Sequence, residues 1–330
     1  MCEQETSQRQ LFSVLVSELQ KAEHVALCGH VSPDGDCVGS MLALGLALRQ
    51  MGKKVVFYSS DPVPEIYAFL PGAAEVRVEL EQHSQFDLFV AVDCSMPDRL
   101  GNLQALLDRA GRVAVIDHHA GSVPFGNVYL NLPDKAATGE IVYDLLLWLP
   151  VVIDEDIATC LYVAIVTDTG SFSYDNTGSR THHIAAELLE LGIKADLINK
   201  RLHEEKPLVS LQILGVVLQT LDLSDCGRVA WMFIQRETLH RLNALDEHVD
   251  GLVNFPRLIK GVELALFFRE LENGKYKVSL RSKYYLDVNK LAALFGGGGH
   301  PRAAGCVLEG NLEDVKQQLL QATLPILKGE

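Results

Sequence analysis

The sequence predicts an α/β fold whose N-terminal part is a doubly wound, mostly parallel sheet. Three short apolar runs, with the composition of buried strands, alternate with segments of helical spacing. Each run stops abruptly at acids or imidazoles; the runs are Val25–Cys28, Phe86–Val92 and Arg112–Ile116. The carboxyl ends of such strands lie along one edge of the sheet, where ligands bind.

The other elements of the first 205 residues complete this alternation. One further strand is expected over Lys53–Ser59. The expected helices cover Leu11–Ala22, Val38–Met51, Pro97–Arg109, Thr138–Leu149, a segment capped by Asp154 that runs through Cys160–Val166, Thr181–Leu191 and Ala195–Glu205. We therefore assign residues 1–205 to one layered domain.

The rest of the chain predicts a smaller α/β domain behind a helical connector. The apolar helix Pro207–Leu221 places the linker at residues 206–222 and the second domain at 223–330. The expected elements are a strand over Arg228–Ile234, short helices over Glu237–Leu242 and Glu247–Phe255, a hairpin of Val262–Leu271 and Lys275–Ser282, a helix over Asp287–Phe295, a strand over Ala303–Leu308 and a helix over Leu312–Leu327.

Composition narrows the class of protein. A chain of 330 residues with 48% hydrophobic and 22% charged residues can form two globular cores, and no apolar run is long enough for a membrane span. Seven cysteines without a C-x-x-C pair, and no signal-peptide pattern, favour a reduced, cytoplasmic protein.

The charge is unevenly distributed. A net charge of −14 disfavours binding to long duplex nucleic acid. The stretch 275–302 nevertheless holds six basic residues against the single acid Asp287, which suits a small anionic substrate: Lys275, Lys277, Arg281, Lys283, Lys290 and Arg302.

The polar residues at the run ends predict a metal site. They are His30, Asp34, Asp36, Asp93, Asp117, His118 and His119, with Asp168 after Cys160–Val166. So many carboxylates in one place would raise one another's pKa, and divalent cations resolve that conflict. Taken alone, Asp117-His118-His119 is equally consistent with a hydrogen-bonded turn. We interpret the neighbouring Cys28, Cys37 and Cys94 as small buried hydrophobic residues.

Two further features of the sequence indicate a binding site for an anion. Arg99 follows Asp93 by about one helical turn and is either a phosphate ligand or a surface arginine. Four glycines, Gly296–Gly299, lead directly into His300 and Arg302. A flexible linker is the alternative here, but the residues that follow favour a loop whose backbone approaches an anion.

Taken together, these motifs resemble the DHH/DHHA1 phosphoesterase family. Five segments stand in family order across nearly the whole chain: His30–Asp36 with Gly39-Ser40, Val92-Asp93, Asp117-His118-His119, Thr167-Asp168-Thr169-Gly170, and Arg281-Ser282 with Gly296–Gly305. Ser32 and Cys37 replace the Asn and Ala common in relatives, at positions that are not family metal ligands. The resemblance implies a DHH domain and a DHHA1 domain with the active site in the cleft between them.

The resemblance also implies the roles of single residues. His30, Asp34 and Asp93 would hold one ion, and Asp36, Asp93, His118 and Asp168 a second, usually both Mn²⁺, with Mg²⁺ or Co²⁺ as substitutes. His119 and Arg99 would act at the reacting phosphate, and Asp117 would complete the catalytic set by orienting an imidazole or the loop. The second domain would bind the far end of the substrate through Arg281, Ser282, Gly298, Gly299, His300 and Arg302.

The family type most similar in length and domain content implies a function. We expect hydrolysis of RNAs of a few nucleotides to 5′-mononucleotides, and of 3′-phosphoadenosine 5′-phosphate to AMP, by a homodimer. Alternatives are a phosphodiesterase for cyclic dinucleotides or single-stranded DNA, and a non-catalytic nucleotide-binding protein. A pyrophosphatase is disfavoured because that branch carries a different C-terminal signature.

Overall fold

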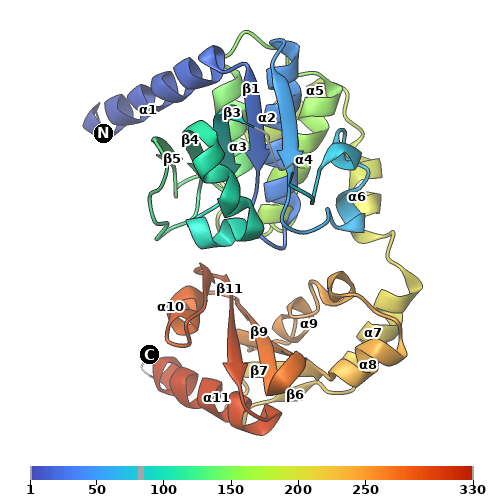
Figure 1. Cartoon of the computed structure of the whole chain (residues 1–330). Helices are drawn as coiled ribbons and strands as arrows, with labels where there is room; N and C mark the ends of the chain where they lie inside the picture. The colour runs from blue at the N-terminus through green and yellow to red at the C-terminus, as the bar shows by residue number, and fades with distance from the viewer. Residues whose placement is uncertain (1, 81–84, 329–330) are drawn as a thin grey trace. The chain divides into compact units, whose positions relative to one another are not determined.

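The computed structural model describes residues 2–80 and 85–328 (Figure 1). The chain folds into two compact units, Met1–Glu204 and Glu205–Glu330. Each unit has its own sheet and its own hydrophobic core. Over the described ranges, no helix combines the length and the apolar character that a membrane span requires.

A five-stranded parallel sheet forms the centre of the first unit. The strand order is β2-β1-β3-β4-β5, which confirms the predicted doubly wound fold. The strands are β1 (His24–Cys28), β2 (Lys54–Tyr58), β3 (Phe86–Val92), β4 (Ala110–Asp117) and β5 (Val128–Asn131). The order reverses between β1 and β3, and ligands bind at such switch points in open α/β sheets.

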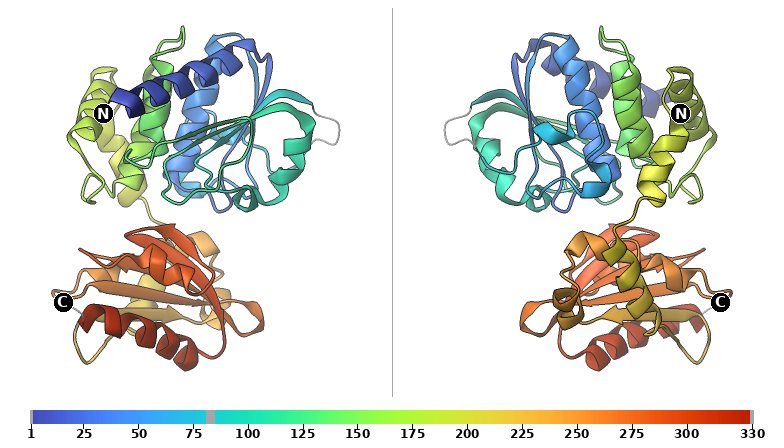
Figure 2. Two further views of the ribbon diagram at one scale, coloured as in Figure 1. Left: turned by 90° about the vertical axis from the view of Figure 1, so that its left-hand side faces the viewer. Right: turned by 90° about the vertical axis from the view of Figure 1, so that its right-hand side faces the viewer.

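Helices cover both faces of this sheet (Figure 2). The α-helices are α1 (Cys2–Lys21), α2 (Gly35–Gln50), α3 (Thr138–Leu146), α4 (Glu155–Asp168), α5 (Ser179–Glu190) and α6 (Ala195–His203), and the 3₁₀ segments are η1 (Glu65–Tyr67), η2 (Ala73–Glu75) and η3 (Pro97–Arg109). The larger core packs against α2 to α5, and a smaller apolar cluster packs against η3 on the opposite face.

Two helices that carry acids of the predicted site pack closely. A Cβ at Gly39 of α2 would lie 2.4 Å from the carbonyl oxygen of Cys160 in α4, so only glycine fits there. Asp154 caps α4 as predicted, since its Oδ1 accepts a hydrogen bond from the Ile157 amide at 3.0 Å. The same helix ends at Asp168.

Two expectations for the first unit were wrong in detail. The segment Pro97–Arg109 is not an α-helix but a 3₁₀ segment, interrupted at Gly101, whose φ of 58° lies in the left-handed region. Residues 128–131, where no strand was predicted, form β5 and pair with β4. A strand of only four residues gives too short an apolar alternation to be recognised from sequence.

The second unit contains a six-stranded mixed sheet in the order β10-β11-β9-β8-β7-β6. The strands are β6 (Asp222–Leu223), β7 (Val229–Ile234), β8 (Leu264–Glu270), β9 (Lys275–Ser282), β10 (Gly298–His300) and β11 (Ala303–Glu309). The β7–β8 pair is parallel and the others are antiparallel. The predicted hairpin is the β8–β9 pair, and its turn contains Asn273 and Gly274, both with positive φ.

Helices cover this sheet unequally. They are α7 (Leu208–Leu218), α8 (Arg236–Arg241), α9 (Asn254–Arg257), α10 (Val288–Ala293) and α11 (Leu312–Lys328), with η4 (Asp246–Val249) and η5 (Glu272–Gly274). The core under α10 and α11 lies on one face, and a second cluster under α7 and α9 lies on the other. The helix expected over Glu247–Phe255 is instead split into η4 and α9 around Gly251, whose φ is 78°. The expected glycine loop contains the short strand β10.

Candidate metal centre

Three neighbouring strands bring polar residues to the same edge of the first sheet. His30 follows β1, Asp93 directly follows β3, and His118 directly follows β4. These three strands are neighbours in the sheet (Figure 1). The φ of Asp93 is 56°, which is uncommon for a residue other than glycine, and its amide donates to the carbonyl of Ile116 at 2.8 Å. Such backbone strain is concentrated at functional sites.

The first group of side chains surrounds His30, which is buried. Its Nε2 lies 3.4 Å from Asp93 Oδ2 and 3.8 Å from Asp34 Oδ1. Its Nδ1 lies 2.8 Å from the Val31 carbonyl oxygen, so Nδ1 carries the donated proton and Nε2 faces the carboxylates. Asp34 is the N-cap of α2, accepting from the Cys37 amide at 3.1 Å, and its side chain is 54% exposed.

The second group surrounds His118. Its Nε2 lies 3.2 Å from Asp168 Oδ2, 3.6 Å from Asp36 Oδ2 and 3.7 Å from Asp93 Oδ1. Its Nδ1 lies 3.1 Å from the carbonyl oxygen of Lys135. The two carboxylate oxygens of Asp93 therefore face different imidazoles.

Asp36 also anchors the start of α3, a role that sequence reasoning missed. Its Oδ2 accepts from the Thr138 amide at 2.7 Å, and its Oδ1 accepts from the Gly139 amide and the Ser40 hydroxyl, both at 2.9 Å. The helix has no side-chain cap of its own, because Ala137 occupies its N-cap position. Asp36, which belongs to α2, caps α3 instead. Its negative charge lies at the positive end of the α3 dipole.

Thr138 links the two groups. Its hydroxyl donates to Asp93 Oδ1 at 2.8 Å while its amide holds Asp36, and the residue is fully buried. The sequence Thr138-Gly139-Glu140 indicated only a helix start. Its contact with carboxylates 102 and 45 residues away has no local signal.

Asp117 holds His119 next to the cluster. Asp117 is fully buried; its Oδ1 accepts from His119 Nδ1 at 2.7 Å, and its Oδ2 accepts from the Ser122 hydroxyl at 2.5 Å. His119 Nδ1 also lies 3.6 Å from Asp93 Oδ1. The side-chain amide of Asn131 donates to the His119 carbonyl at 3.0 Å, which fixes the backbone there.

Burial works against the charged form of each group, and the neighbours decide the outcome. Burial lowers the pKa of His30, but hydrogen bonding of the imidazole to the carboxylate oxygens of Asp34 and Asp93 outweighs burial and raises that pKa to about 10. Burial likewise lowers the pKa of His118, and the charges of three carboxylates, Asp168 foremost, raise it to about 10. Burial raises the pKa of Asp168 to about 6, even beside the opposing charge of His118. Positive charge thus has to balance these carboxylates.

The donor set fits hard divalent cations. Ligand atoms of Asp36, His118 and Asp168 lie within 4.8 Å of one another, and so do those of His30, Cys37 and Asp93. Carboxylates with a few imidazoles suit Mn²⁺ or Mg²⁺. Burial raises the pKa of the Cys37 thiol well above its usual value and so keeps it protonated. The predicted burial of the three neighbouring cysteines, Cys28, Cys37 and Cys94, is confirmed.

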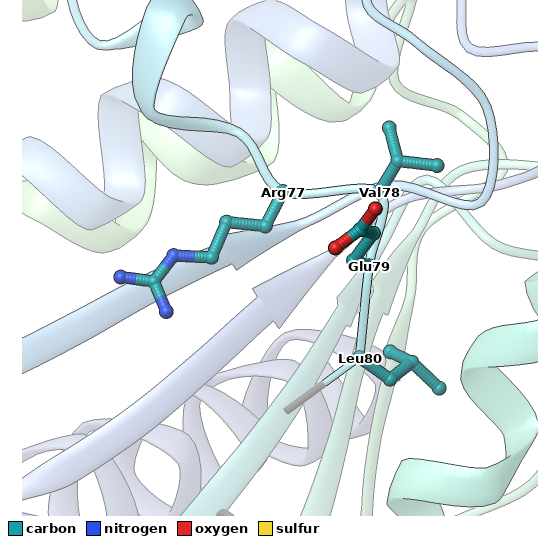
Figure 3. Close-up of a pocket in the computed structure, with 4 residues that line it drawn as sticks. All are labelled: Arg77, Val78, Glu79 and Leu80. Atoms are coloured by element: carbon teal, nitrogen blue, oxygen red, sulfur yellow. The ribbon is translucent and has the colours of Figure 1, made fainter. Parts of the chain in front are cut away.

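Two other features of the first unit lie outside these groups. Arg99 is exposed, and its carbonyl accepts from the Val31 amide at 2.7 Å, next to His30. A surface hollow of about 550 Å³ is lined by Arg77, Val78, Glu79 and Leu80 (Figure 3). Its first residue, Arg77, forms an isolated parallel β-bridge with Tyr58 of the edge strand β2. None of the clustered acids or imidazoles lines this hollow.

The predicted substrate residues of the second unit occupy β9, β10 and the turn before β11. Arg281 is half-buried and its Nη1 donates to the Leu280 carbonyl at 3.0 Å. Ser282 is buried, 3.5 Å from the Pro301 carbonyl, and Arg302 Nη1 donates to Leu286 at 3.1 Å.

The glycines around β10 differ in how much space surrounds them. A Cβ at Gly297 would lie 2.1 Å from the Gly305 carbonyl oxygen, and one at Gly299 would lie 2.4 Å from that of Ala303. These two glycines allow β10 to fold closely over β11. Gly298 is exposed and has more space, since the nearest atom to a Cβ there, in Asn289, is 3.7 Å away. His300 ends β10 and is half-buried.

Known proteins share both the fold and the motifs. The model of the DHH family N-terminal domain matches residues 24–165, and that of the DHHA1 domain matches residues 219–328. The crystal structure of an exopolyphosphatase-related protein from Bacteroides fragilis is similar with a TM-score of 0.89 and 27% identity, over 97% of this chain and 98% of that one. The fold and the acid–imidazole site thus define a phosphoesterase of the two-domain DHH class.

Curated relatives extend over almost the whole chain. The bifunctional oligoribonuclease and PAP phosphatase of Thermus thermophilus is 33% identical over 93% of this chain and 92% of its own length. The protein of the same description from Bacillus subtilis is 28% identical over 88% of this chain and 91% of its own length. The chain belongs to the DHH/DHHA1 phosphoesterase family, which confirms the resemblance predicted from its motifs.

Proposed function

We propose that this protein is a manganese-dependent phosphoesterase that hydrolyses RNAs of a few nucleotides to 5′-mononucleotides, and 3′-phosphoadenosine 5′-phosphate to AMP. The observation that supports the chemistry is the position of Asp93, whose Oδ2 faces His30 and whose Oδ1 faces His118. A carboxylate placed in this way can bridge two cations. The substrates are supported by the names of the relatives from Thermus and Bacillus.

The two groups of side chains would each hold one Mn²⁺, with Mg²⁺ or Co²⁺ as substitutes. The first ion would be held by His30, Asp34 and Asp93, and the second by Asp36, Asp93, His118 and Asp168. When bound, such ions lower the pKa of a water and stabilise charge on the phosphate oxygens.

The chain's own residues orient the reactants. Hydrogen bonds from Nδ1 of His30 and His118 to backbone carbonyl groups orient each Nε2 toward the cluster, and such bonds fix the ring of a metal-binding histidine. Asp117 holds His119, which we assign to the nonbridging phosphate oxygens together with Arg99. In the second unit, we assign recognition of the far end of the substrate to Arg281 and to the exposed Gly298 region, with Gly299 and His300.

A substrate panel tests this function. The full-length chain with Mn²⁺ is given triribonucleotide, 3′-phosphoadenosine 5′-phosphate, cyclic dinucleotide, a short single-stranded DNA and pyrophosphate. We expect the first two to be hydrolysed most efficiently, by kcat/KM. Pyrophosphate as the only good substrate would overturn the assignment, and preference for the cyclic dinucleotide or DNA would replace it with the alternative specificity.

A second test, of the bridging carboxylate, replaces Asp93 by asparagine. The change Asp93→Asn keeps the size of the side chain and removes its charge. We expect kcat to fall by about 100-fold or more, because both groups of ligands use this carboxylate. Circular dichroism of the variant should match the wild type. Full activity of a correctly folded variant would contradict the bridging role.

A further inference from the structure

One short backbone segment carries both His30 and Asp34, which we assign to the same ion. The segment connects the end of β1 with the start of α2. His30 Nε2 lies 3.8 Å from Asp34 Oδ1 and 3.4 Å from Asp93 Oδ2. The path of the intervening residues 31–33 therefore decides whether these side chains can reach one cation together.

Ser32, in the middle of this segment, has a strained backbone. Its φ is 53°, in the left-handed region that residues other than glycine rarely adopt. Pro33 follows it, and the ring of a proline drives the preceding residue toward extended conformations. Ser32 departs from both preferences. A conformation of this kind persists only where the surrounding structure holds it in place.

Two other parts of the first unit hold the segment by its backbone amides. The Val31 amide donates to the Arg99 carbonyl at 2.7 Å, and the Ser32 amide donates to Asp61 Oδ2 at 2.6 Å. A carboxylate acceptor makes a hydrogen bond stronger than one between neutral groups. The Val31 carbonyl oxygen in turn accepts from His30 Nδ1 at 2.8 Å. Asp61 thus stabilises the strained residue directly.

The sheet brings Asp61 to this position. Strands β1 and β2 are parallel, and their last residues, Cys28 and Tyr58, pair with each other. The chain therefore leaves both strands at the same edge, so Ser32 and Asp61 come together although they are 29 residues apart. Asp61 is half-buried, and Pro62 behind it restricts its backbone, so its carboxylate starts from a defined position.

We infer that Asp61 is a positioning residue for the first ion. Its carboxylate holds Ser32 in the left-handed conformation, and that conformation sets the path from His30 to Asp34. Asp61 acts through the backbone and is not a ligand itself. The inference rests on the proposed function and deepens it, because it names a residue outside the ligand set on which binding of the first Mn²⁺ depends.

Calorimetric titration of the metal-free, full-length protein with Mn²⁺ tests the inference. In Asp61→Ala we expect the Mn²⁺ affinity to fall roughly 10-fold, as for other residues that orient ligands. Asp61→Asn keeps an acceptor oxygen and should retain most of the affinity. The matched control is Asp87→Ala. Asp87 Oδ2 accepts from the amides of Glu23 and His24, at 2.9 and 2.8 Å, at the opposite edge of the same sheet, so its loss should leave the Mn²⁺ affinity unchanged.

A second change separates backbone positioning from attraction between the charge of Asp61 and the cation. Glycine adopts a positive φ readily, so Ser32→Gly combined with Asp61→Ala should restore most of the lost affinity. Attraction through space would not be restored in this way. Wild-type affinity in Asp61→Ala, or a loss that Ser32→Gly does not reverse, would overturn the positioning role. If Asp61→Ala alone does not fold, the double variant decides, because an affinity well below that of the wild type would likewise overturn the role.

The outcomes separate this inference from the proposed function. Turnover of the substrate panel by the wild type, with unchanged Mn²⁺ affinity in Asp61→Ala, would overturn the positioning role alone. Mn²⁺ binding that depends on Asp61, in a wild-type chain that hydrolyses no member of the panel, would overturn the proposed function and leave the positioning role standing.

Discussion

At the scale of single residues, buried groups that touch no substrate set the geometry of the metal centre. Thr138 is the clearest case, because one residue holds two carboxylates, Asp36 through its amide and Asp93 through its hydroxyl. The Lys135 carbonyl oxygen holds the imidazole of His118 in place through its Nδ1. The salt bridge between Lys135 and Asp144 fixes that segment on α3.

Replacing Thr138 by valine tests this positioning role. The change keeps the shape of the side chain and removes the donor to Asp93 Oδ1, so we expect Mn²⁺ affinity to fall roughly 10- to 100-fold, as with other outer-shell residues. Calorimetric titration of the metal-free, full-length protein with Mn²⁺ measures it. Thr138→Ser keeps the hydroxyl and should restore most of the affinity. Equal affinity of the valine and wild-type proteins would refute the role.

The sequence predicted which polar residues lie close together where those residues follow directly after a strand; their roles as metal ligands stay predictions. The proximity of His30, Asp93 and His118 followed from three apolar runs that end in polar residues, because parallel strands share one edge. Thr138 was missed, since its partners are far away in sequence and a threonine at a helix start has an ordinary structural explanation.

At the scale of elements, the site depends on where helices begin and end. The start of α2 carries Asp34 and Asp36, α4 ends at Asp168, and α3 begins against Asp36. Gly39 permits the close contact of α2 with α4 that brings these ends together. Helix ends offer polar backbone groups, and here the carboxylates satisfy those of α2 and α3.

Substitution of glycine tests the role of this helix contact. In Gly39→Ala the new Cβ would lie 2.4 Å from a backbone carbonyl, so we expect the free energy of unfolding to fall by about 1–3 kcal/mol. Gly215→Ala is the matched control, because Gly215 lies inside α7 with no atom within 4 Å of a Cβ, and alanine should stabilise by roughly 0.5–1 kcal/mol. Urea unfolding in EDTA measures both changes. Effects of the same sign would contradict the packing argument.

The elements that sequence reasoning missed share a physical cause. β5 and β10 have four and three residues, too few for a periodic pattern, and they exist because neighbouring strands offer hydrogen-bonding partners. The 3₁₀ segment η3 is interrupted at Gly101, where an added Cβ would lie 2.4 Å from Ser60 Oγ. Contacts of this kind are formed only in the folded chain.

At the scale of the whole molecule, the chain separates two kinds of chemistry. The first unit gathers acids and imidazoles at the edge of a parallel sheet, whereas the second gathers cations on one face of a mixed sheet. A net charge of −14 and small basic sites suit short, highly charged substrates better than polymers. Each unit has its own hydrophobic core.

The most direct test of the central claim is a crystal structure of the full-length protein grown with Mn²⁺, with anomalous difference density measured at a wavelength where manganese scatters. We predict two peaks, one bounded by His30, Asp34 and Asp93 and the other by Asp36, Asp93, His118 and Asp168. Manganese bound only elsewhere in the molecule, or no peak among these side chains at saturating Mn²⁺, would contradict the account.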